Sequence, residues 1–218
     1  PRSLVHNVET LARLAVVARG LPAPPTRLLS VLSGSPDQGR FVVEVPTSTT
    51  FTELLEGLGE PMHPSAVLLG GYGGRWERWE SVADLPVDEA ALRRAGTSLG
   101  AGVVAPLARE ACGVRQTAAV VAYLASMSAR QCGPCVFGLP ALAAGLADLA
   151  AATGGRSVVG TLLDDAAAVE GRGACHHPDG ATGLVASAVE TFRADVEAHA
   201  AGRACQLSRQ VVLPGLST

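Results

Sequence analysis

The sequence contains no lysine, few aromatic residues and no block of one charge. All 17 basic residues among its 218 are arginine, and 20 acidic residues give a net charge of −3. The absence of a basic patch argues against a nucleic-acid-binding protein and against a protein that binds acidic membranes. We therefore expect a small molecule or another protein as the partner.

Long apolar runs are also lacking. The most apolar stretch, residues 136–152, contains Pro140 and Asp148 and falls short of the roughly 20 residues that a membrane helix needs. We therefore expect no membrane insertion. No charged-then-apolar signal peptide opens the sequence, which predicts a cytoplasmic protein whose cysteines are thiols or metal ligands and not disulfides.

An initiating methionine is missing from the start. The first residue is Pro1, and the methionines, Met62 and Met127, lie far inside the sequence. We therefore expect the chain to be part of a longer protein. With 48% apolar residues, it can bury a sizeable core, in one large domain or two small ones.

Hydrophobic periodicity predicts a mixed first half. It predicts a helix that Asn7 caps and Gly20 ends, strands near residues 28–32 and 41–45, a helix that opens with the Thr50–Glu53 capping box and ends at Gly59, and a strand at residues 66–69. A loop of five residues, four of them glycine, follows at residues 70–74. Because this loop opens no predicted helix, it is a very weak phosphate-binding candidate. The element order suits a small β-grasp module, although other α+β arrangements fit it too.

The second half is predicted to be helical. After a short helix at residues 89–94 and a strand near 102–107, four apolar stripes occur at residues 114–124, 139–149, 158–169 and 185–196. Four amphipathic helices with short connections predict a four-helix bundle. The predicted fold class is therefore α+β, with a small β-grasp module followed by a C-terminal helical bundle.

Three cysteines fall in the predicted interhelical loops. Cys132 and Cys135 form a Cys-x-x-Cys between the first and second helices, and Cys175 lies between the third and fourth. In an antiparallel bundle these loops meet at one end, so three thiolates could bind an iron–sulfur cluster or zinc. Spacing alone leaves plain thiols equally open. Cys112 and Cys205, near helix ends, are predicted to be unliganded.

Several motifs resemble the flavin-bearing subunit of respiratory complex I, the NADH-quinone oxidoreductase family. Residues 4–11 (LVHNVETL) resemble its V-N-N-V-E-T-L signature, residues 129–135 (ARQCGPC) its C-G-x-C-x-P-C, and residues 170–175 (EGRGAC) its I-E-G-x-x-x-C. The landmarks occur in order from Arg2 to about Cys205. They identify the chain as similar to the C-terminal part of that subunit.

This resemblance implies a domain order. Residues 1–26 would be the end of a missing domain for FMN and NADH, residues 27–108 a ubiquitin-like (SLBB) module, residues 109–205 the iron–sulfur bundle and residues 206–218 a tail. The first signature asparagine is replaced by His6, which leaves Asn7 as a candidate FMN contact. A plain helix-cap role for Asn7 is the alternative.

The resemblance also assigns cluster ligands. Cys132, Cys135 and Cys175 fall on ligands of a [4Fe–4S] centre, whereas Ala129 stands at the first ligand position. A [3Fe–4S] cluster, or a [4Fe–4S] cluster with another fourth ligand, would then form. His176 and His177 are the candidates for that ligand, with Ser128 a poorer one. Zinc held by three cysteines and a histidine, or an empty site, are the alternatives.

The function that follows is electron transfer from a flavin, through the cluster, to a partner redox protein such as a ferredoxin or another subunit. Catalysis itself would belong to the missing flavin domain. The alternative is a redox-inactive scaffold of the same fold. Trp76 and Trp79 fit either a protein-contact edge or packing on the small module, and the flanking Asp179 is expected to cap the fourth helix.

Overall fold

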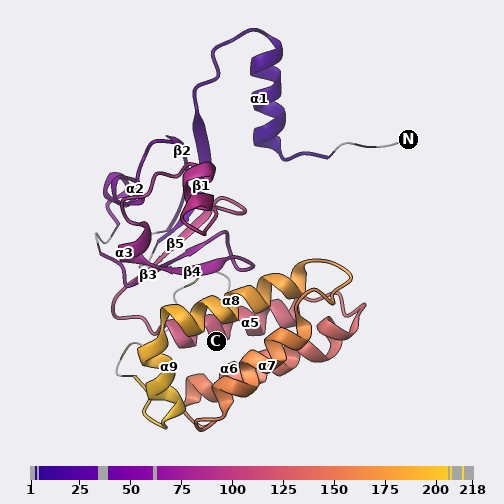
Figure 1. Ribbon diagram of the computed structural model, residues 1–218. Helices are drawn as coiled ribbons and strands as arrows, with labels where there is room; N and C mark the ends of the chain where they lie inside the picture. The colour runs from indigo at the N-terminus through magenta and orange to yellow at the C-terminus, as the bar shows by residue number, and fades with distance from the viewer. Residues whose placement is uncertain are drawn as a thin grey trace.

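A computed structural model describes residues 3, 5–33, 39–60, 63–205, 207 and 213. The fold is α+β, with one mixed sheet and a helical region that follows it (Figure 1). The strands are β1 (Thr26–Leu32), β2 (Arg40–Pro46), β3 (Ala66–Leu69), β4 (Arg75–Arg78) and β5 (Val103–Leu107). The helices are α1 (Val8–Ala18), α2 (Phe51–Leu58), α3 (Trp79–Val82), α4 (Glu89–Arg94), α5 (Gly113–Ser126), α6 (Leu139–Ala151), α7 (Val158–Val169), α8 (His177–Thr191) and α9 (Arg193–Ala200), with a π-helical turn, η1 (Pro134–Gly138), before α6.

The sheet has the strand order β2-β1-β5-β3-β4. β1 and β5 run parallel, with Ser30 opposite Val103, and every other neighbouring pair is antiparallel. The predicted capping box opens α2: Thr50 accepts a hydrogen bond from the backbone N–H of Glu53, and the Glu53 carboxylate accepts one from that of Thr50. The turn predicted between β1 and β2 includes residues 34–38, which lie outside the described residues.

Strand β3 lies between two apolar cores. Its residues alternate, so that Ala66 and Leu68 face the helical region while Val67 and Leu69 face α2 and its neighbours. Because side chains along a strand point to opposite faces, the four apolar residues of β3 bury both sides of the sheet. The sheet is therefore the middle layer, and helix α8 packs directly on β4 (Figure 1).

Strand β4 was not predicted from the sequence and forms a hairpin with β3 across the glycine-rich loop. Trp76 and Trp79 are buried, so the protein-contact edge is wrong. Trp79 packs in the core of the small module, as the alternative has it, whereas Trp76 packs in the core of the helical region. The Trp76 ring meets Phe192 edge to face at 5.2 Å, and its backbone N–H donates to Ser187 Oγ at 3.1 Å. This strand thus fastens the sheet to the helices.

The fourth predicted helix is two helices. α8 ends at Thr191, and α9 begins at Arg193 after a break at Phe192, whose backbone leaves the helical region. The break turns the aromatic ring inward, where a Cβ on Gly113 would lie 2.4 Å from it. Only glycine fits there, because the start of α5 approaches the ring so closely.

A glycine of the loop before β4 has a packing role. A Cβ on Gly180 of α8 would lie 3.0 Å from the Cα of Gly73, so two backbones approach where neither residue has a side chain. Helix α8 can therefore lie close against the sheet edge.

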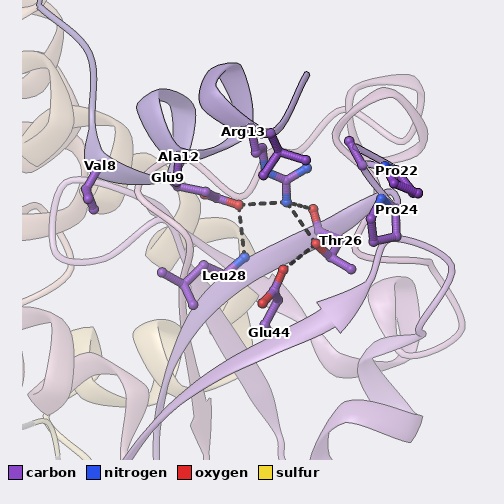
Figure 2. Close-up of a pocket in the computed structure, with 11 residues that line it drawn as sticks. Val8, Glu9, Ala12, Arg13, Pro22, Pro24, Thr26, Leu28 and Glu44 are labelled. Carbon is purple, nitrogen blue, oxygen red and sulfur yellow. Dashed lines mark hydrogen bonds and ion pairs between the residues drawn. The ribbon is translucent and has the colours of Figure 1, made fainter. Parts of the chain in front are cut away.

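Helix α1 stands apart from both cores (Figure 1). None of its residues is buried, and its apolar face is open, with Val8 76% and Val17 62% exposed. Figure 2 shows how it is joined to the sheet: Glu9 pairs with Arg13 at 3.0 Å and accepts the Leu28 N–H at 3.2 Å, while Arg13 also bonds Thr26. A pocket of about 350 Å³ lies between α1 and β1.

The segment Pro134–Ala151 is, by length and composition alone, long and apolar enough to cross a membrane. Core helices of soluble proteins pass the same test. One face of this segment, with Leu139, Leu142 and Leu146, packs in the helical core against α5 and α7.

Candidate functional site

The two cysteine-bearing loops lie at the same end of the helical region (Figure 1). Cys132 and Cys135 follow the end of α5, and Cys175 occupies the loop between α7 and α8. The helices run back and forth, which brings residues 40 positions apart to one end, as an antiparallel arrangement requires. Cys132 is partly buried, Cys135 buried and Cys175 exposed.

The π-helical turn η1, which contains Cys135, packs against helix α7. A Cβ on Gly138 would lie 2.2 Å from Cγ2 of Val169, the last residue of α7. Glycine is therefore required where this turn meets the end of α7, close to the start of the Cys175 loop. A π-turn inside an α-helix often marks a functional site.

Backbone N–H groups point at two of the sulfurs. The N–H groups of Ala174 and Cys135 donate to the Cys132 thiol and, led by the Ala174 bond, hold its pKa below the usual value. Burial and the neighbouring Cys132 thiol raise the pKa of Cys135, against the N–H of Arg130, which lowers it. Arg130 donates from a left-handed conformation, φ 53°, at the position where the family motif has glycine. Hydrogen bonds of this kind stabilise thiolates and tune iron–sulfur centres.

The third sulfur belongs to the same electrostatic cluster. The charge of Cys175 acts on Cys135, and Ala174, its neighbour in the chain, bonds Cys132. In the described part of the chain, one group of potential metal ligands has all its ligand atoms within 4.8 Å of one another. That group does not include these three cysteines. The sulfurs of Cys132, Cys135 and Cys175 therefore do not all lie within 4.8 Å of one another. Two sulfurs on one tetrahedral zinc are roughly 3.8 Å apart, whereas the thiolates of a cluster bind separate irons.

The first ligand position of the family motif offers no donor, because Ala129 is an exposed alanine. The adjacent Ser128 hydroxyl is buried and has no hydrogen-bond partner among the described residues. This orphaned oxygen and three thiols, two of them with backbone N–H donors, fit a thiolate-bound cluster with a ligand other than cysteine at one position.

The two histidines after Cys175 differ in their surroundings. The His176 side chain is fully exposed, and its Nδ1 lies 2.9 Å from Asp179 Oδ2. His177 is the first residue of α8 and bonds the Leu124 carbonyl through Nε2 at 3.0 Å, so it ties α8 to α5. The prediction that both histidines lie in a solvent-exposed loop is therefore confirmed for His176 and wrong for His177.

Asp179 does not cap the helix, because α8 begins two residues before it. Its carboxylate instead accepts the Gly171 N–H at 2.8 Å and pairs with His176. These contacts, the Gly171 bond first, hold the pKa of Asp179 below its usual value. Asp179 therefore spans the loop that carries Cys175 and fixes it to the helix.

Asn7 acts as a helix cap in this structure. Its side chain accepts the backbone N–H of Thr10 at 2.8 Å and opens α1. An exposed cap of this kind needs no ligand to explain it.

Sequence reasoning missed a second group of ligand types. Cys112 and Cys205, predicted to be separate unliganded thiols, lie with His199 so that their ligand atoms are within 4.8 Å of one another. The three residues come from the start of α5, the last turn of α9 and the segment after it. Burial, followed by a hydrogen bond with Cys205, raises the pKa of Cys112 to about 12. No motif spacing signals this group, since 87 residues separate its first two members.

Residues 108–199 match the family model described as the NADH-ubiquinone oxidoreductase-F iron-sulfur binding region. Among curated proteins, the F subunit of NADH-quinone oxidoreductase from Streptomyces coelicolor is 28% identical over 93% of this chain and 47% of its own length. Its counterpart from Buchnera aphidicola is 27% identical over 89% of this chain and 46% of its own length. The chain thus spans about half the length of these curated relatives.

Solved structures share the fold. An NAD+-reducing [NiFe]-hydrogenase in the H2-reduced state matches 90% of this chain and 34% of its own, with a TM-score of 0.75 and 21% identity. The air-oxidized state of an NAD+-reducing [NiFe]-hydrogenase matches 96% of this chain and 38% of its own, with a TM-score of 0.73 and 21% identity. At this identity the likeness establishes the fold and nothing further.

Proposed function

We propose an electron-transfer role for this chain, whose residues 108–199 match the NADH-ubiquinone oxidoreductase-F iron-sulfur binding region. In this role an electron passes from a flavin held elsewhere in the protein to a partner redox protein. The observation that carries the proposal is the meeting of two cysteine loops, with backbone N–H groups directed at the sulfurs.

Cys132, Cys135 and Cys175 would hold a [3Fe–4S] or [4Fe–4S] cluster. When bound, such a cluster takes up and gives up electrons one at a time. The chain's own part is to fix the sulfurs: the Ala174 and Arg130 N–H groups stabilise negative charge on them, and burial of Cys135 keeps water from one side.

We assign His176 as the candidate fourth ligand. A histidine that binds a metal through one nitrogen usually donates its other N–H to a carboxylate. The Nδ1 contact of His176 with Asp179 has this form and leaves Nε2 free for iron. Ser128 is the second candidate, on account of its unpaired hydroxyl. His177 is the weakest, because its Nε2 already bonds Leu124.

The domain assignment belongs to the same proposal. Residues 27–108 form a β-grasp (ubiquitin-like, SLBB) module, supported by the order β2-β1-β5-β3-β4 with parallel central strands. Residues 109–205 form a helical bundle, with α8 and α9 together filling the place of a fourth helix, and residues 206–218 follow as a tail.

Residues 1–26 are proposed as the end of a domain that binds FMN and NADH. The unburied apolar face of α1 supports a neighbour that covers it. Asn7 would contact FMN only within that larger assembly, since here it caps α1. Catalysis with NADH belongs to that domain, and we place the whole protein in the cytoplasm.

The redox partner is proposed to approach the cysteine end. Phe137 is 75% exposed, and Met127 62% exposed, on either side of the Cys132–Cys135 turn. A shallow pocket of about 400 Å³ beside Phe137 also involves Arg172 of the Cys175 loop. Aromatic, methionine and arginine side chains are enriched in protein interfaces, and electron transfer requires a partner near the cluster.

A redox-inactive scaffold, or zinc at the same three cysteines, is the second candidate. The absence of a cysteine at position 129, where alanine stands, favours the redox-inactive scaffold. The sulfurs of the three cysteines do not all lie within 4.8 Å of one another, which disfavours a single tetrahedral zinc ion, whose sulfur ligands are roughly 3.8 Å apart.

The test is anaerobic reconstitution of the full chain with iron and sulfide. We expect a brown protein whose visible absorbance bleaches on reduction and returns on oxidation. Cys132→Ala should lose this colour, while the matched Cys205→Ala, at a cysteine outside the site, should keep it. A colourless parent chain, or equal colour in both variants, would contradict the proposal.

A further inference from the structure

The buried group at the other end of the helical region has the chemistry of a metal site. Cys112 and His199 are fully buried, and Cys205 is partly buried. Thiolate sulfur and imidazole nitrogen are the ligands that zinc prefers in proteins. Neither Cys112 nor Cys205 belongs to the loops of the proposed iron–sulfur site.

Hydrogen bonding fixes the tautomer of His199. Its Nδ1 lies 3.0 Å from the Leu149 carbonyl oxygen, which can only accept, so Nδ1 carries the proton. The lone pair is therefore on Nε2, which faces both cysteines. A backbone carbonyl behind the ring is the common support of a metal-binding histidine.

The spacing also suits one ion. Cys112 Sγ lies 3.7 Å from His199 Nε2. A tetrahedral zinc with Zn–S near 2.3 Å and Zn–N near 2.05 Å separates sulfur and nitrogen by roughly 3.6 Å. We propose that Cys112, His199 and Cys205 bind one zinc ion, a second metal site independent of the iron–sulfur loops.

Charge balance supports an ion in this apolar setting. Two thiols lose their protons to solvent as Zn²⁺ enters, so two thiolates, a neutral imidazole and the ion sum to zero charge. A neutral site avoids the cost of burying net charge. In this structure His199 Nε2 accepts a hydrogen bond from the Cys205 N–H at 3.2 Å. When zinc binds, the lone pair of Nε2 coordinates the ion instead.

The ion would hold three elements together. Cys112 precedes α5, His199 lies in the last turn of α9, and Leu149, behind the imidazole, is near the end of α6. Cys205 is only partly buried, so a water molecule would supply the fourth ligand from that side. We therefore assign this zinc a structural role in fixing α9 to the bundle.

The experiment separates this site from the cysteine loops. In a chain with Cys132→Ser, Cys135→Ser and Cys175→Ser, elemental analysis after zinc loading and desalting should find about one zinc per chain. Adding Cys205→Ser, a small change at a partly buried position, should reduce bound zinc to near zero. Cobalt should give thiolate-to-metal absorption only when Cys205 is present.

A second comparison guards against misfolding of the triple variant. In the otherwise unaltered chain, a chelator should lower the melting temperature, and Cys205→Ser should remove that shift, since metal binding couples to folding. Equal zinc with and without Cys205, or a Cys112–Cys205 disulfide with no zinc, overturns the proposal. Neither result bears on the iron–sulfur cluster, whose own test uses iron and colour.

Discussion

The two cysteine groups lie at opposite ends of α5 and α6 and are built in different ways. Cys132, Cys135 and Cys175 belong to loops, where backbone N–H groups and solvent surround the sulfurs. Cys112 and His199 lie at packed helix ends and are fully buried, and Cys205 lies in the segment after α9. The loops offer a wide, charge-tolerant site suited to a cluster that exchanges electrons. The core offers a compact, charge-neutral one suited to a single structural ion.

Thiol reactivity should separate the groups most sharply. At pH 7 a thiol with a pKa of about 12, such as Cys112, is almost wholly protonated, while N–H bonds favour the thiolate of Cys132. In metal-free protein we expect Cys132 to alkylate at least roughly tenfold faster than Cys112, because the small thiolate fraction of Cys112 outweighs the greater nucleophilicity of its thiolate. Peptide mass spectrometry after timed iodoacetamide treatment measures both rates. Similar rates would remove the electrostatic distinction between the groups.

A core substitution beside the buried Cys112–His199–Cys205 group should lower the free energy of unfolding more than a similar substitution at the cysteine loops. Phe192 is buried against Trp76 and Gly113, next to Cys112 in the chain. Phe192→Ala should cost about 3–5 kcal/mol of unfolding free energy, because it leaves a cavity. Chemical denaturation measures the loss, with the exposed Phe137→Ala as the control of the same chemistry. A loss as small as that of Phe137→Ala would show that the junction is not tightly packed.

Restoring the missing ligand should change only the loop site. Ala129→Cys supplies a fourth thiolate, so iron per chain should rise toward about four with equal sulfide. His176→Ala in the same background should then have little effect, whereas in the parent it should lower iron content. Iron that stays near roughly three per chain in Ala129→Cys, or that still falls when His176→Ala is added to it, would indicate that residue 129 does not face the cluster.

The smallest expected effect concerns the support of the Cys175 loop. The lowered pKa of Asp179 means that its carboxylate stabilises the fold above the unfolded pKa of about 3.9. That stability is lost as pH falls through the lower folded pKa. Between pH 6 and pH 3, the denaturation midpoint should fall more in the parent than in Asp179→Asn. The exposed Asp164→Asn is the control and should behave like the parent.

The sequence predicted those parts of the fold that local rules determine. The capping box at Thr50, the cap at Asn7, and the helix at residues 89–94 depend on neighbours within four positions and were found where expected. Strand β4 was missed because its four residues, Arg-Trp-Glu-Arg, carry one buried side chain and depend on β3 for pairing. The break at Phe192 depends on a ring that contacts Trp76 more than a hundred residues away.

The same distinction between local motifs and long-range packing holds for the candidate site. A Cys-x-x-Cys is visible as a motif, and its meeting with Cys175 needed only the antiparallel helix order. The Cys112–His199–Cys205 group has no such motif, since its members meet only after the whole helical region has packed. The roles of His176 and Asp179 depended on a helix start three residues earlier than the sequence suggested.

Electron paramagnetic resonance of the anaerobically reconstituted chain tests the iron–sulfur assignment most directly. A three-iron cluster is paramagnetic when oxidised and a four-iron cluster when reduced by one electron, so either form gives a signal in one of the two states. We expect such a signal in the parent and its loss in Cys135→Ala. A parent chain without an iron–sulfur signal in both states would contradict the assignment.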